Sequence, residues 1–135
     1  MFRRAYQASQ AFIRTMATFR KPGVASPAEI ANFLTSHPTA VVVDVRDPSS
    51  AEPSVTLGPL PPSALRPRAI SAPIDRATGA LDLQCIPAGS AVITHCGGGG
   101  RGQKAREFLL KNGFKNVING GGPEDAECWA MFGHL

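Results

Sequence analysis

One cysteine stands in a setting that suits nucleophilic chemistry. Cys96 directly follows the apolar run Ala91–His95, and Gly97–Gly100 and then Arg101 come after it. The run predicts a buried strand and Gln103–Asn112 a helix, so the thiol is expected at a strand's carboxyl end, where α/β sheets bind ligands. Consecutive glycines let successive N–H groups turn inward as an anion nest, and the helix N-terminus adds partial positive charge. Such surroundings lower a cysteine pKa from ~8.5 to between ~3.5 and ~7.5, so Cys96 is predicted to react as a thiolate.

Two other interpretations of the segment around Cys96 have to be weighed against a reactive thiolate. A buried, inert cysteine beside a flexible turn is the ordinary role of a free thiol, because cysteine packs as a small hydrophobe. Four consecutive glycines between a strand and a helix are hard to explain by packing alone. A nucleotide-binding P-loop is excluded because no Gly-Lys-Ser/Thr ends the segment.

The rest of the chain predicts the elements that would position this thiol. Ser26 and Glu29 form a capping box, so a helix is expected over 27–36, ended by Pro38. Short apolar runs predict strands at 40–45, 69–72, 91–95 and 117–118, and a last helix is expected from Pro123 through Trp129. Strands that alternate with helices indicate an α/β fold with a parallel sheet.

Length and charge narrow the class of protein. The chain has 135 residues, which indicates one domain. Residues 1–25 hold five basic residues and no acidic one, and the remainder has nine basic against ten acidic residues. No basic surface for nucleic acid is therefore expected in the body. Three cysteines without paired spacing argue against both a disulfide framework and a metal site, and no apolar run is long enough to span a membrane.

The first residues suggest a separate segment. Residues 1–23 are expected to form a basic leader or an extra helix, and 24–135 the domain. The leader is arginine-rich and acid-free with apolar residues at helical spacing, features of an organelle transit peptide. If it is one, we expect a mitochondrial or other organelle matrix location, and otherwise a cytoplasmic one.

Several motifs occur in the order in which rhodanese domains carry them. Asp44-Val45-Arg46 follows a buried strand, "RAISAPID" spans 68–75, the Cys96–Arg101 loop comes next, and "GFKNVINGG" spans 113–121. Over residues 24–131 the chain resembles a single-domain rhodanese-like sulfurtransferase. The resemblance implies a central parallel sheet of about five strands with helices on both faces. It implies Cys96 as the catalytic residue, and a substrate-binding loop of Gly97, Gly98, Gly99, Gly100, Arg101 and Gly102.

The resemblance also implies a reaction. A sulfane sulfur would move from thiosulfate or another persulfide donor, through a Cys96 persulfide, to cyanide or a thiol. The partners would be a small sulfur-containing anion and a thiol acceptor, with no metal or organic cofactor, and the protein is expected to be a monomer. Asp44 and Arg46 would support the neighbouring loop structurally.

The length of the loop distinguishes sulfur transfer from the reactions of other enzymes with this fold. Phosphatases and arsenate reductases of the same fold use C-x5-R, whereas Arg101 makes the present loop C-x4-R. The shorter loop favours sulfur, although His95 before the cysteine resembles the His-Cys pair of phosphatases. A binding or sulfur-carrier module without enzymatic activity is the other alternative.

The sequence also departs from the family. The loop has glycine where many members carry a basic residue after the cysteine, and a proline-rich stretch replaces the usual Gly-His-Ile-Pro lead-in. Arg66 and Arg68 are expected to be solvated, with added positive charge at the mouth of the site as the alternative. Cys85 and Cys128 are expected to be unreactive.

Overall fold

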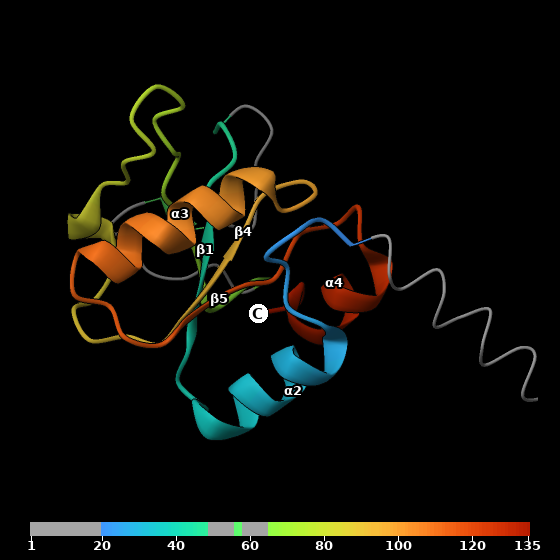
Figure 1. Cartoon of the computed structure of the whole chain (residues 1–135). Helices are drawn as coiled ribbons and strands as arrows, with labels where there is room; N and C mark the ends of the chain where they lie inside the picture. The colour runs from blue at the N-terminus through green and yellow to red at the C-terminus, as the bar shows by residue number, and fades with distance from the viewer. Residues whose placement is uncertain (1–19, 49–55, 58–64) are drawn as a thin grey trace, which may run out of the picture.

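A computed structural model describes residues 20–48, 56–57 and 65–135 of the chain (Figure 1). Most of the expected leader and most of the proline-rich stretch therefore lie outside the described residues. Arg20 and Lys21, which were expected in the leader, lie within them.

A parallel sheet forms the centre of the described fold. Its strands run in the order β2-β3-β1-β4-β5, and every neighbouring pair is parallel. The strands are β1 (Val41–Asp44), β2 (Thr56–Leu57), β3 (Ala69–Ser71), β4 (Val92–His95) and β5 (Val117–Asn119). The expected α/β class with a parallel sheet is confirmed. Four strands of three or four residues make up most of this sheet, and β2 adds only a two-residue pairing at the β3 edge.

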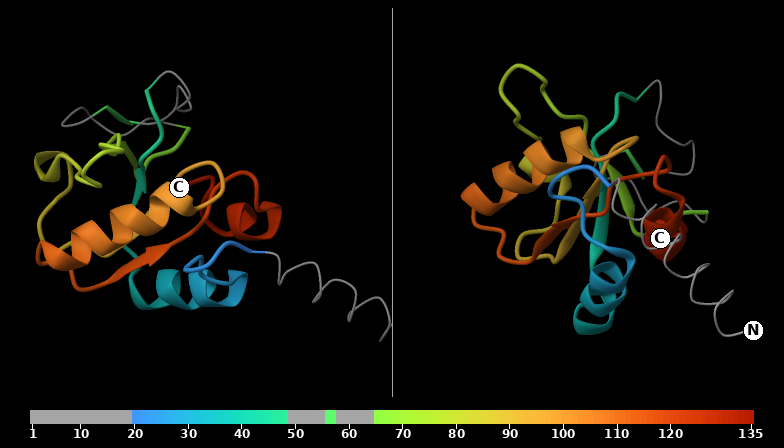
Figure 2. Two further views of the ribbon diagram at one scale, coloured as in Figure 1. Left: turned by 45° about the horizontal axis from the view of Figure 1, so that its top comes forward. Right: turned by 45° about the vertical axis from the view of Figure 1, so that its right-hand side comes forward.

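Helices cover both faces of the sheet (Figures 1 and 2). On one face, Ala105 and Leu109 of α3 (Gly100–Lys111) pack in a core with Val43 and Val92. On the other face, α2 (Pro27–Ser36) and α4 (Ala126–Phe132) contribute Ile30, Cys128 and Phe132 to a second core, together with Val42 and Ile93. A short 3₁₀ helix, η1 (Leu83–Cys85), borders the first core. The apolar runs lack polar alternation because both faces of each central strand are buried.

The helix α2 spans the residues predicted from its capping signals. The Ser26 hydroxyl accepts a hydrogen bond from the backbone N–H of Glu29 at 3.1 Å, and the Glu29 carboxylate accepts one from the Ser26 N–H at 3.4 Å. These two bonds satisfy donors that a helix start leaves free. Ile30 then points inward and is fully buried.

The bounds of the other two helices differ from those predicted. The helix α3 begins at Gly100, not at Gln103, because the Gly99 carbonyl already accepts from the Gln103 N–H at 2.9 Å. The helix α4 begins at Ala126, with Asp125 as its N-cap, not at Pro123. Glu124 instead belongs to a turn whose backbone N–H donates to the Gly97 carbonyl at 3.0 Å. The Gly99 carbonyl thus marks the start of α3, and the Asp125 side chain, which accepts from the Cys128 N–H, marks that of α4.

Parallel strands bring their carboxyl ends to one edge of the sheet. Asp44 lies opposite both Ser71 and His95, and Thr94 lies opposite Asn119. All five of these polar side chains are buried. This buried polar row supports the segments that leave the sheet at this edge, the cysteine loop among them.

Candidate active site

The thiol of Cys96 lies just beyond β4 and is nearly buried, with 3% of the residue exposed. Its Sγ accepts a hydrogen bond from the backbone N–H of Gly99 at 3.0 Å. Burial raises the pKa of this thiol, but hydrogen bonds from the loop backbone outweigh burial and hold the pKa below its ordinary value. The contributing N–H groups, from the largest effect to the smallest, belong to Gly102, Gly99, Gly98 and Arg101. The arrangement stabilises a thiolate, which is the nucleophilic form of cysteine.

The loop reaches this geometry through one left-handed residue. Gly99 has φ +113° and precedes the first turn of α3. A side chain there would be strained, and its Cβ would lie 2.5 Å from a methyl carbon of Val24. The chain therefore turns back at Gly99 and aims the free N–H groups of the first turn of α3 at the sulfur.

A single amide side chain ties this loop to the neighbouring strand. Asn119, at the end of β5, donates from Nδ2 to the Gly99 carbonyl at 2.8 Å and accepts from the Gly121 N–H at 3.0 Å. The Thr94 hydroxyl donates to the Gly102 carbonyl at 2.8 Å. Buried polar side chains therefore hold the loop at Gly99 and at Gly102.

The glycine turn after β5 forms a second wall of the site. The Gly121 carbonyl accepts from the backbone N–H of Cys96 at 3.0 Å. A side chain on Gly122 would collide with the carbonyl oxygen of Cys96. This close approach requires glycine and keeps Cys96 at a fixed position relative to the turn.

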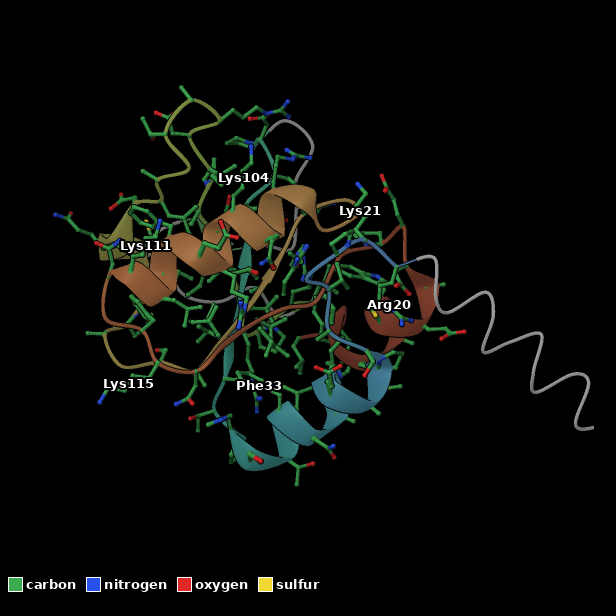
Figure 3. The ribbon with its side chains drawn as sticks, in the orientation of Figure 1. Arg20, Lys21, Phe33, Lys104, Lys111 and Lys115 are labelled. Carbon is green, nitrogen blue, oxygen red and sulfur yellow. The ribbon has the colours of Figure 1, made fainter. Side chains whose placement is uncertain are left out.

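In front of the thiol lies an open hollow of about 360 Å³. Three of its lining side chains are basic and one is acidic. It is lined by Lys21, Cys96, Gly97, Gly98, Gly100, Arg101, Lys104 and Glu124. Figure 3 shows Lys104 on α3 and Lys21 on the N-terminal segment beside it. Cys96 thus lines a hollow in which basic side chains outnumber acidic ones.

The predicted loop residues lie together at this site. Gly97, Gly98 and Gly100 line the hollow with Arg101, whereas Gly99 and Gly102 are buried behind it. Arg101 acts on the thiol through its backbone N–H, because the N–H is the group that lowers the Cys96 pKa. Its half-buried side chain lines the hollow, where it can meet an incoming anion.

The two residues predicted to support the site form a buried ion pair. Arg46 donates to the Asp44 carboxylate from Nη2 at 2.7 Å and from Nε at 3.0 Å, and its backbone N–H donates to the same group at 3.0 Å. Burial raises the pKa of Asp44, but these bonds from Arg46 lower it below the ordinary value. The ion pair lies at the carboxyl end of β1, beside β4.

A second buried pair joins His95 to Arg66. His95 Nδ1 lies 3.1 Å from the carbonyl oxygen of Cys96, so Nδ1 carries the proton, and Nε2 accepts from Arg66 Nη2 at 3.1 Å. Burial lowers the pKa of His95 to about 4, so the ring is neutral at pH 7. Its ring also contacts Trp129 and Phe132. His95 is thus bonded locally.

The expectation for Arg66 is wrong. Only 4% of this residue is exposed, and its guanidinium lies 5.0 Å from the centre of the Trp129 ring. It is therefore neither solvated nor part of the lining of the Cys96 hollow. The proline-rich surroundings gave no indication that its cation packs against an aromatic ring and bonds to His95. Arg68 is half-buried, and its backbone N–H donates to the Leu135 carbonyl.

The other two cysteines are free but lie in environments unlike that of Cys96. Burial and Asp82 raise the pKa of Cys85, whose thiol lies 3.6 Å from that carboxylate. Burial and a bond with Asp125 raise the pKa of Cys128 to about 11, and its thiol donates to the Ala25 carbonyl. Both environments favour the unreactive thiol.

The residues of the site that were not predicted from the sequence include Lys21, Lys104, Asn119 and Glu124. Lys104 could have been found, because it stands three residues after Arg101 on one helix and so shares its face. The other three come from distant segments. Local patterns do not indicate that Asn119 bonds to Gly99 or that Glu124 lies over the loop.

Known proteins give little further information. No family model matches the chain, and no curated protein does. Among solved structures, an uncharacterized protein from Saccharomyces cerevisiae is 23% identical, and the match covers 82% of this chain and 92% of that one with a TM-score of 0.48. Within the described ranges, no helix is long and apolar enough to cross a membrane, and no three His, Cys, Asp or Glu side chains form a group that could hold a metal ion.

Proposed function

We propose that the protein is a sulfurtransferase with a rhodanese-like fold that carries a sulfane sulfur on Cys96. The observation that supports the proposal most directly is the thiol ringed by backbone donors, with the Gly99 N–H at 3.0 Å and the pKa held low despite burial. A buried thiol whose pKa is lowered, with an open hollow in front of it, is suited to nucleophilic attack on a small, electron-poor sulfur.

The reaction has two displacements. The Cys96 thiolate attacks the outer sulfur of thiosulfate, a new S–S bond forms, and the bond to the sulfonate sulfur breaks with release of sulfite. The persulfide carries one negative charge, which the same loop N–H groups stabilise. An acceptor thiolate or cyanide then attacks the outer sulfur, and the electron pair of the broken S–S bond returns to Cys96 Sγ.

The compact loop is consistent with this chemistry. Only Gly97, Gly98 and Gly99 separate Cys96 from the start of α3. The N–H groups of Gly98 and Gly99, and those of Arg101 and Gly102 in the first turn of α3, act on Sγ itself. A wider C-x5-R loop would be suited to a tetrahedral oxyanion. The present geometry therefore favours sulfur over phosphate or arsenate.

The test is an assay with purified protein. Thiosulfate and cyanide are supplied, thiocyanate is measured, and intact-protein mass is recorded after thiosulfate alone. We expect turnover and a mass gain of one sulfur atom, both lost in Cys96→Ser and retained in the control Cys85→Ser. Turnover that survives Cys96→Ser would contradict the mechanism. A folded protein that binds thiosulfate without turnover would instead support the binding module, and hydrolysis of an aryl phosphate through Cys96 would support a phosphatase.

A further inference from the structure

The side chains around the Cys96 hollow carry charges of both signs. We propose, on the basis of the proposed sulfurtransferase function, that the natural sulfur acceptor is a small thiol bearing both an ammonium and a carboxylate group. Glu124 binds the ammonium group, and Lys21 binds the carboxylate. Glu124 and Lys21 are thus specificity-determining residues that lie outside the cysteine loop.

The position of Glu124 is the first argument. Its backbone N–H is fixed by the Gly97 carbonyl at 3.0 Å, and its carboxylate extends over the loop. A Cβ on Gly97 would lie 3.2 Å from Oε1, and a Cβ on Gly98 would collide with Oε2. Glu124 therefore occupies the space that loop side chains would fill if these residues were not glycine.

The second argument is that this carboxylate is available to a ligand. Glu124 is exposed and lines the hollow together with Cys96. It forms no ion pair with any side chain in the described part of the chain. Next to a negatively charged Cys96 persulfide, this carboxylate favours an acceptor that also brings a positive charge over an acceptor that brings only a negative one.

The third argument is that Lys21 approaches the same point from another segment. Its Nζ would lie 2.9 Å from a Cβ on Gly98. The preceding residue anchors this segment, because Arg20 Nε donates to the Asp125 carboxylate at 2.7 Å. The Val24 N–H adds a bond to the Lys21 carbonyl at 3.2 Å. A cation and an anion thus stand side by side above Gly98, which is the complement of a zwitterion.

The reaction step itself is the second displacement. The acceptor thiol loses its proton to water, and its thiolate attacks the outer sulfur of the Cys96 persulfide. A new S–S bond forms on the acceptor, the bond between Sγ and the outer sulfur breaks, and Sγ keeps the electron pair. The ammonium and carboxylate groups take no part in the bond changes, so they affect binding and orientation only.

The experiment follows single turnovers of preformed Cys96 persulfide with small thiols that differ in charge. Cysteamine brings an ammonium, 3-mercaptopropionate a carboxylate, cysteine both, and 2-mercaptoethanol neither. Loss of the persulfide is followed by rapid quench and mass spectrometry. For each variant, the rate constant of each thiol is divided by the rate constant of 2-mercaptoethanol. The ratios are then compared with those of the wild type. This comparison cancels differences in the intrinsic reactivity of the thiols.

We expect Glu124→Gln to lower the ratios for cysteamine and cysteine about fivefold, the factor that corresponds to ~1 kcal/mol for one exposed ion pair. The ratio for 3-mercaptopropionate should stay equal or rise. Lys21→Met should lower the ratios for 3-mercaptopropionate and cysteine and spare cysteamine. Glu124→Asp keeps the charge and should retain part of the preference. Matched controls are Glu107→Gln and Lys115→Met, which change exposed residues outside this hollow.

The outcomes separate the two proposals. If the persulfide forms on Cys96 but the ratios are unchanged in Glu124→Gln and Lys21→Met, the inference is overturned and the sulfurtransferase function stands. Wild-type protein that prefers 2-mercaptoethanol over cysteine would overturn it as well. If no persulfide forms on wild-type Cys96, the proposed function fails, and the inference about its acceptor fails with it.

Discussion

The side-chain amide of Asn119 donates a 2.8 Å hydrogen bond to the carbonyl oxygen of Gly99 and so joins the end of β5 to the loop that surrounds Cys96. The same side chain accepts from the Gly121 N–H, which places both glycine segments around one buried group. Asn119 is 1% exposed, so water cannot replace these bonds. The geometry around the Cys96 thiol therefore depends on a residue that acts through the loop backbone.

Replacement of Asn119 by alanine should destabilise the fold and impair the thiol. The change leaves the Gly121 N–H without its partner, and loss of one buried partner costs ~1–3 kcal/mol. Urea unfolding measures the stability, and the pH dependence of Cys96 alkylation should move to higher pH as the loop relaxes. Asn112→Ala removes a side-chain bond at the far end of α3 and should leave the alkylation profile unchanged. An unaltered Cys96 profile in Asn119→Ala would contradict the positioning role.

Two adjacent glycines should respond differently to alanine. Gly98 has no left-handed backbone, and the atoms nearest to a Cβ there are the flexible ends of Glu124 and Lys21, so Gly98→Ala should fold with near-normal stability. Gly99 has φ +113° and a Cβ there would press on Val24 and on the backbone of Gly121 at 3.2 Å. Gly99→Ala should lose more than ~1 kcal/mol of stability and most of the Cys96 reactivity. Thermal unfolding and thiocyanate formation give the comparison, and equal effects of the two changes would speak against the loop geometry.

The three cysteines should titrate in a definite order. Cys96 has a pKa below its ordinary value, whereas the pKa of Cys85 is raised and that of Cys128 is raised to about 11. Iodoacetamide labelling from about pH 5 to about pH 9, read by peptide mass spectrometry, should therefore modify Cys96 first. Labelling in urea, where all three thiols are exposed and unperturbed, is the control and should abolish the order. Faster labelling of Cys85 in the folded protein would refute the activation of Cys96.

Acid should weaken the fold through His95. Its pKa falls from 6.5 to about 4 in the folded protein because the ring is buried, so the unfolded chain binds the extra proton. Stability is then fully present above pH 6.5 and is lost progressively as the pH falls to about 4, by ~3 kcal/mol at ~1.4 kcal/mol per pKa unit. Urea unfolding across this range should show the loss in wild type and in the surface control His134→Gln. The free energy of unfolding of His95→Asn should be lower at pH 7 but should not change over the same pH range. If it falls with pH as steeply as in the wild type, His95 is excluded as the cause.

Local signals predicted the scaffold well. The apolar runs of β1 and β4 indicated strands buried on both faces, and the capping box of Ser26 and Glu29 gave the bounds of α2. The position of Cys96 at a strand end also followed from the sequence, because parallel connections place it there. The start of α3 was missed because glycine is a poor helix former, whereas here buried partners such as Thr94 fix the first turn.

Contacts between distant segments could not be predicted in the same way. Arg66 pairs with His95 across 29 positions, and Asn119 reaches Gly99 across 20. Arg20 meets Asp125 across 105 positions. A short window of sequence shows composition and periodicity, but it does not show which buried polar groups will satisfy one another once the sheet has formed.

The glycine-only loop has a consequence for redesign of the site. The groups that activate the thiol are backbone N–H groups, so they are the same whatever side chains surround them. Apart from Arg101, the charged side chains that line the hollow stand outside the glycine segment, at Lys21, Lys104 and Glu124. The proposed activation of the thiol and the proposed selection of the acceptor thus rest on largely separate parts of the chain. A library randomised at positions 21, 104 and 124 should change which thiols are used while every member keeps a working nucleophile.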